Sequence, residues 1–303
     1  MANSDIKLII KGGALCAAFC FMVLFVPALG MVVNYFALLP LFYVGICLGI
    51  RAYLLAGIIP LTAALLILGP VGICFYTLTT FLPSFVVLYW HFSKNEKGYI
   101  FSLIDILHLL SSRFLGVVTL GFCYLKATNS KLLEGLFHKV ELITNLAKLP
   151  SSSGSVIEVL PGVFCFLWLM MVWLNFQVAY SIALKSNKAL RKPLISESFY
   201  LPPFWDIAFI GALWLIIANQ LFMGSNMLGI FSRTALCISA FPLLIDGITI
   251  AKLMARSYKL PHYVTVILMV FIFLLVWPMV FVVVLGLIEP LYGLKKKYYS
   301  KLD

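Results

Sequence analysis

The sequence predicts an all-α fold, a polytopic bundle of about eight or nine transmembrane helices. Of its 303 residues, 63% are hydrophobic and only 11% are charged, whereas soluble proteins carry about 25% charged residues. The mean hydropathy is +1.08, and a water-soluble domain cannot bury that much apolar surface. The net charge of +11 comes from basic residues between the apolar runs, as in cytoplasmic loops. We therefore expect a lipid bilayer as the partner and no nucleic acid.

Nine apolar runs approach the ~20 residues that a helix needs to cross a bilayer. They lie near 12–33, 36–50, 53–69, 71–92, 99–124, 161–184, 204–222, 226–250 and 263–289. The second and third runs are short, and Gly69-Pro70 separates the third from the fourth. Tilted, broken or re-entrant segments are therefore alternatives to simple crossings at these positions.

The distribution of Lys and Arg predicts a cytoplasmic N-terminus, because cytoplasmic loops carry the excess of basic residues. The C-terminal lysines conflict with a count of nine, which leaves Lys295, Lys296, Lys297 and Lys301 on the outer side. Either the last run, interrupted by Pro278, does not cross simply, or one of the short runs is miscounted.

The longest connection contains an amphipathic segment, residues 129–149, with apolar side chains at helical spacing. This pattern suits a helix at the membrane interface, and a helix packed against the rest of the protein would show the same pattern. The serine-rich run 151–155 that follows is typical of a flexible joint.

Enzyme signatures are absent from the sequence. It contains no GxSxG, HExxH or Walker loop, and its seven cysteines include no CxxC pair. We expect no enzyme activity, no metal and no cofactor.

The most unusual polar residues lie in the fifth apolar run, where each charge costs several kcal/mol unless it finds a partner or water. Asp105 and His108 are three residues apart and share a helix face, whereas Arg113 lies about 12 Å further along the axis. We predict ligand binding by these three residues, with Asn175 and Asn219 as additional ligand contacts. A hydrogen-bonded cluster that fixes helix register is the alternative.

Two further features concern helix packing and a later carboxylate. Ala14 and Ala18 form a small-xxx-small pair in the first run, a pattern that lets another helix approach closely. Asp246 in the eighth run lies close to Lys252, and we expect it to pair with that basic segment.

Several stretches resemble one family of membrane proteins. They are LLPLFYVGICLGIR (38–51), TTFLPSFVVLY (79–89), LLIDGITIAKLMARSYKLPHYV (243–264) and VLGLIEPLYGLKKK (284–297). In these stretches the chain is similar to the YybS-like family of predicted bacterial membrane proteins, which has no assigned function. That family is grouped by fold with the substrate-binding subunits of energy-coupling-factor transporters. This chain has Asp246 where family members have Gln, and Glu289 where they have Asp.

The resemblance implies an organisation and a set of partners. It implies one integral membrane domain, 1–303, with a substrate-subunit-like unit at 1–184 and additional C-terminal helices at 204–290. It also implies a bacterial inner-membrane location, and a transmembrane coupling subunit with an ATPase as partners, docked through Ala14 and Ala18. The function expected is small-molecule binding or transport, and the alternative is a non-transporting scaffold or assembly factor.

Overall fold

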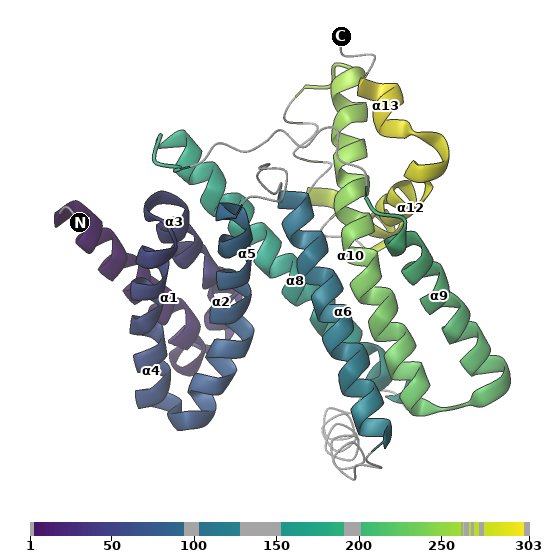
Figure 1. Ribbon diagram of the computed structural model, residues 1–303, viewed down its shortest axis with the longest axis horizontal. Helices are drawn as coiled ribbons and strands as arrows, with labels where there is room; N and C mark the ends of the chain where they lie inside the picture. Colours follow the sequence, from purple (N-terminus) through teal and green to yellow (C-terminus); the bar gives the residue numbers. More distant parts are fainter. Residues whose placement is uncertain are drawn as a thin grey trace. The chain divides into compact units, whose positions relative to one another are not determined.

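The computed structural model describes residues 3–93, 103–127, 153–190, 201–261, 263, 267, 270–272 and 276–299. Every element formed by these residues is a helix (Figure 1), which confirms the predicted all-helical class. Six of the helical segments are long and apolar enough to cross a membrane. They are Asn3–Phe25, Pro27–Leu48, Ile50–Phe92, Val159–Lys185, Phe204–Phe222 and Met227–Ser257.

Large apolar side chains on the outside of these helices are exposed. Leu66 and Val71 are 85% and 79% exposed, and Phe222 is 82% exposed. Such side chains are stable in contact with lipid tails and unfavourable in water. The chain is therefore a helical membrane protein.

The chain divides into two compact units, and each draws on both halves of the sequence. Unit 1 comprises Met1–Leu110 and Trp168–Ser196, and unit 2 comprises Ser111–Leu167 and Glu197–Asp303. Helices α6 (Leu103–Ala127) and α8 (Ser153–Lys185) contribute to both units. The substrate-subunit-like unit at 1–184 that the resemblance implies stays a prediction.

Unit 1 begins with two helices where a single span, 12–33, is expected. Helix α1 (Asn3–Phe25) ends before Pro27, and α2 (Pro27–Asn34) begins there. Proline is favoured at the first position of a helix because it lacks the N–H group that would be left unbonded. Gly30 then lies against the backbone of Val23 with no room for a side chain, so α2 packs back against the end of α1.

A helical hairpin follows α3 (Leu38–Leu48) in unit 1. It consists of α4 (Ile50–Tyr76), the π-helix η1 (Thr77–Phe81) and α5 (Leu82–Phe92). The Tyr53 hydroxyl donates a hydrogen bond to the Phe81 carbonyl, 2.6 Å away, and Gly57 contacts the Phe81 ring. Gly69, halfway between these partners, has φ 69° and ψ −160°. The predicted break at Gly69-Pro70 is therefore where the chain turns back (Figure 1).

The π-helix supplies carbonyl oxygens that accept hydrogen bonds from other helices of unit 1. Besides the Tyr53 contact, the indole N–H of Trp168 donates to the Thr79 carbonyl at 2.8 Å. A π-helical turn disrupts the regular bonding of a helix and leaves such carbonyls available. Helix α8 is thereby fixed to η1.

Helix α8 also corrects one expectation from the sequence. The serines and glycine predicted to form a flexible joint at 151–155 include Ser153, where α8 begins. Residues 153–155 instead form the first turn of α8, a continuous helix of 33 residues. The amphipathic segment 129–149 lies outside the described residues.

Unit 2 is built around α10 (Asn226–Ser257), whose residues are largely buried. Helix α9 (Phe204–Ala218) continues into the π-helix η3 (Asn219–Met223), and the chain then turns back into α10 alongside it (Figure 1). Gly224 adopts the left-handed conformation, with φ 56°, at this reversal, and left-handed backbone is favourable for glycine. The predicted runs 204–222 and 226–250 thus correspond to an antiparallel helix pair, and α10 extends further than expected.

Helix α12 (Val276–Tyr292) crosses α10 at unusually short range. Gly247 of α10 lies against the carbonyl group of Val282, and Gly286 of α12 lies against the carbonyl group of Leu243. Neither site has room for a Cβ atom. This reciprocal pair of glycines lets the two backbones touch, as small residues do in membrane helix packing.

The chain then returns toward α10. Gly293, with φ 55°, separates α12 from the short helix α13 (Leu294–Tyr299). The rings of Tyr258 and Tyr298 lie 6.4 Å apart, so α13 lies beside the C-terminal end of α10.

Candidate functional site

Three charged side chains from different elements meet in the interior of unit 2. Asp246, Glu289 and Lys295 come from α10, α12 and α13, and they are 0%, 2% and 3% exposed. The Lys295 ammonium forms an ion pair with the Asp246 carboxylate. We call these three residues the buried charge cluster.

The close crossing of α10 and α12 positions the cluster. Gly247 follows Asp246 in sequence, and Glu289 lies three residues after Gly286, so both carboxylates flank the crossing. Gly293 then turns the chain, and the Lys295 backbone N–H donates to Glu289, 3.2 and 3.1 Å from the two carboxylate oxygens. Lys295 therefore binds one carboxylate through its backbone and the other through its side chain.

A fourth charged residue, Asp206, acts on the cluster from α9. It lies in the first turn of α9, and its negative charge, like that of Glu289, repels the charge of Asp246. One carboxylate oxygen of Asp206 and one of Asp246 are buried and accept no hydrogen bond within the described part of the chain. Each of these two carboxylates therefore has one oxygen that is short of donors.

Among the described residues, the carboxylates at this place outnumber the cations. Asp206, Asp246 and Glu289 carry three negative charges when ionised, whereas the cation that attracts Asp246 among the described residues is Lys295. Asp246 lies eleven residues, about 16 Å, before the end of α10, well inside a membrane-spanning helix. Uncompensated charge at that depth is costly, so the cluster favours binding a proton or another cation. The described residues form no group of three side chains suited to hold a metal ion.

The sequence-predicted trio lies along α6. Asp105 is helical, and its side chain lies outside the described residues. His108 is half-buried and interacts with neighbouring groups. Arg113 is exposed, in the part of α6 that belongs to unit 2. The predicted ligand site at these three residues stays a prediction.

The two predicted asparagines fall in different units and bond to their surroundings. Asn175 in unit 1 donates from its amide to the carbonyls of Tyr35 at 2.7 Å and Met171 at 2.8 Å. Asn219 in unit 2 accepts a hydrogen bond from the Ser225 N–H at 3.0 Å. Asn175 thus links α8 to the end of α2, and Asn219 fixes the turn between α9 and α10. A ligand role for either stays a prediction.

The small residues of α1 lie on two faces of the helix, one exposed and one buried. Ala14 and Ala18 are exposed, whereas Gly13 is buried against the Ala56 carbonyl of α4. Gly13 therefore serves packing inside unit 1. The alanine face is open, as docking of another helix requires.

The buried charge cluster went largely unrecognised in the sequence. The sequence makes Asp246 conspicuous, but Lys252, the partner that it predicts for Asp246, is exposed. Lys295 lies in a run of three lysines, which is typical of a solvated tail. Gly293 is the residue of the sequence that indicates the cluster. A glycine between an apolar run and a basic run allows the chain to turn back, which brings the basic residues toward the apolar helices.

Comparison with known proteins identifies no relative: no family model, no curated protein and no solved structure matches the chain.

Proposed function

We propose that this membrane protein binds small molecules or takes part in their transport, with the buried charge cluster and Asp206 as its proton-binding site. The observation that carries the proposal is that, among the described residues of unit 2, two buried carboxylates, Asp246 and Glu289, face one buried cation, Lys295. Ionisable groups inside a membrane bundle are costly and commonly serve ion or proton pathways. A carboxylate that gains and loses a proton changes its attraction for Lys295, and such a change biases the packing of α13 against α10.

The test measures the protonation of carboxyl groups directly, so the substrate does not need to be known. Difference infrared spectroscopy of the full-length protein in lipid, recorded through a pH titration, reports protonated carboxyl groups. We expect a carboxyl signal that Asp246→Asn alters and that the matched change Asp5→Asn, near the start of α1, leaves in place. A titration that is identical in wild-type protein and Asp246→Asn contradicts the proposal.

A second candidate function, a non-transporting scaffold, is favoured by the ion pair itself. Lys295 joins α13 to α10 and α12 through its side chain and its backbone, which is also how a purely structural lock is built. Under this alternative Asp246→Asn lowers thermal stability and leaves every carboxyl titration unchanged.

The finer proposals rest on the sequence resemblance. We propose membership of the YybS-like family, a bacterial inner-membrane location and a cytoplasmic N-terminus. A coupling subunit with an ATPase would dock on the exposed face of Ala14 and Ala18. Ala14→Leu/Ala18→Leu in the tagged full-length protein is expected to abolish co-purification of such a complex without changing the amount of protein in the membrane.

A further inference from the structure

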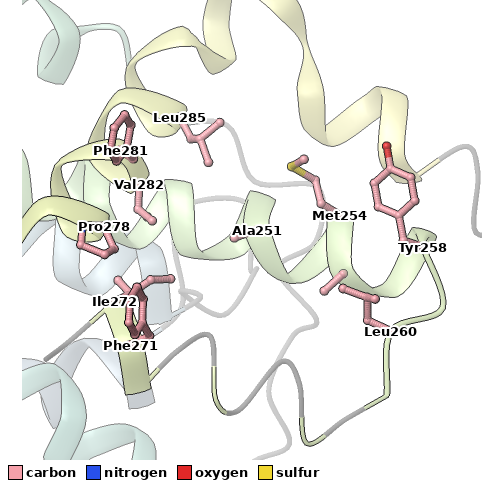
Figure 2. A pocket seen from close by; sticks show the side chains of 11 residues that line it. Ala251, Met254, Tyr258, Leu260, Phe271, Ile272, Pro278, Phe281, Val282 and Leu285 are labelled. Atoms are coloured by element: carbon pink, nitrogen blue, oxygen red, sulfur yellow. The ribbon is translucent and has the colours of Figure 1, made fainter. Parts of the chain in front are cut away.

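An apolar pocket of about 450 Å³ lies alongside the C-terminal end of α10 in unit 2 (Figure 2). Ala251, Met254 and Tyr258 of α10 line one side, and Phe281, Val282 and Leu285 of α12 line another. The volume is typical of a small-ligand site. Apart from the Met254 sulfur and the Tyr258 hydroxyl, the side chains in Figure 2 offer only carbon atoms. The pocket therefore suits a hydrocarbon chain.

The pocket runs lengthwise along α10. Its lining extends from Ala251 to Tyr258, which is about 10 Å of helix, and Leu260 extends it beyond the end of α10. An apolar pocket whose lining follows α10 to its C-terminal end matches a lipid tail that follows the helix toward the membrane surface.

The end of α10 beside the pocket is positively charged. Among the described residues from 247 to 299, every exposed charged side chain is basic: Lys252, Arg256, Lys259, Lys296 and Lys297. The acidic residues in this range, Glu289 and the neighbouring Asp246, are buried. The Tyr258–Tyr298 ring contact keeps the lysines of α13 next to this end of α10. Clusters of Lys and Arg at a membrane surface attract anionic lipid headgroups.

We propose that unit 2 binds an anionic phospholipid, with one acyl chain in this pocket and the phosphate headgroup at Arg256 and Lys259. The headgroup is expected to be anionic because the described exposed side chains at the C-terminal end of α10 carry a net positive charge. Such a surface attracts an anionic headgroup more strongly than a zwitterionic one. The apolar lining gives affinity for the tail, and the basic end gives selectivity for the headgroup.

The experiment is a native mass spectrometry titration of the full-length, delipidated protein in a neutral detergent. Phosphatidylglycerol and phosphatidylcholine with identical acyl chains are compared. We expect tighter binding of phosphatidylglycerol, and a loss of about thirty-fold in that binding for Arg256→Gln/Lys259→Gln. The matched control, Lys7→Gln/Lys11→Gln on α1, is expected to bind as the wild type does. Met254→Trp fills the pocket and is expected to weaken both lipids.

Four outcomes would overturn the proposal. The first is equal binding of the two lipids by wild-type protein, and the second is an equal loss in the Lys7/Lys11 control. The third is unchanged phosphatidylglycerol binding by a folded Met254→Trp variant. The fourth is a lipid-free dimer that Met254→Trp disrupts, since a second copy would then occupy the pocket. If Met254→Trp does not fold, the surface variant Arg256→Gln/Lys259→Gln still decides the proposal.

Discussion

At the scale of single residues, Lys295 contacts both buried carboxylates of the cluster. Its ammonium neutralises Asp246, and its backbone N–H binds Glu289. Removing one partner of a buried ion pair costs about 3–5 kcal/mol, because the remaining charge stays buried, whereas apolar replacement of both partners is often neutral. The side chain and the backbone of Lys295 can therefore be tested separately.

We predict that Lys295→Met lowers the stability of the protein strongly and that Asp246→Leu/Lys295→Met restores most of it. The measurement is thermal unfolding of the purified protein in detergent. Lys296→Met is the matched control, because Lys296 is exposed, and its unfolding midpoint is expected to stay near that of the wild type. A double variant less stable than Lys295→Met contradicts the account of Asp246 as an uncompensated charge.

The sequence predicts polar residues in membrane helices well and their partners poorly. Asp105, His108, Asn175 and Asp246 are conspicuous because each interrupts an apolar run. The partner of Asp246 is 49 residues away in sequence, and no helical periodicity connects two residues across a turn at Gly293. Asn175 similarly finds the Tyr35 carbonyl 140 residues away. Such pairs follow from packing, which a single sequence does not display.

At the scale of elements, the crossing of α10 and α12 depends on two glycines. We predict that Gly247→Ala lowers the free energy of unfolding by about 1–3 kcal/mol, because the new methyl group meets the Val282 carbonyl and forces the helices apart. Gly211→Ala in α9 is the control. No atom lies within 4 Å of its added Cβ, and Ala is a better helix former than Gly. Chemical unfolding of both variants in mixed detergent and lipid measures the difference.

The hairpin of unit 1 depends on backbone conformation alone. Gly69 has φ 69° and ψ −160°, a region that is essentially restricted to glycine, and no atom lies within 4 Å of an added Cβ. We predict that Gly69→Ala destabilises unit 1 by about 1–3 kcal/mol. Gly116→Ala in α6, with equal open space, is expected to be neutral or stabilising. Equal effects of the two changes in thermal unfolding would contradict the assignment of Gly69 as the turn.

Element boundaries follow from the sequence where glycine and proline mark them. Gly69-Pro70 is the turn of the hairpin, and Gly49 ends α3 with φ 88°. The break before Pro27 was missed because the apolar run continues through it without a polar residue. The π-helices η1 and η3 were also missed, since an inserted residue in a helix leaves no mark in composition.

At the scale of the molecule, the return of α13 addresses the conflict between the number of spans and the basic tail. Lys252 and Arg256 lie near the end of α10, and the lysines of α13 lie beside the same end. The last apolar run therefore does not deliver the tail to the opposite side of unit 2. This arrangement agrees with the tendency of basic segments to share one side of the membrane.

We predict that Lys259→Cys and Lys296→Cys, each in a background without the seven native cysteines, react with a membrane-impermeant maleimide from the same side. Both positions are exposed. Labelling in intact cells and in inverted vesicles distinguishes the two sides. Reaction of the two cysteines from opposite sides would show that α13 does not return to the end of α10.

The fold class was predictable because composition alone requires it. A chain with 63% hydrophobic residues has to satisfy its backbone hydrogen bonds within helices when it lies in lipid. The division into two units was not predictable, since α6 and α8 are each a single unbroken helix that belongs to both units. The hydrophobicity of such a helix does not indicate which neighbouring helix packs against each half of it.

The ion pair between Asp246 and Lys295 also constrains how the protein is made. A ribosome that adds about 5–20 residues per second needs about 2–10 s to translate the 49 residues between the two partners. During that interval α10 enters the membrane with Asp246 lacking its cation, at an insertion cost of about 3 kcal/mol. Newly made α10 is therefore held in place by α9 and its other neighbours until the last turn of the chain is complete. A chain that ends before Lys295 would keep Asp246 in the membrane without its cation.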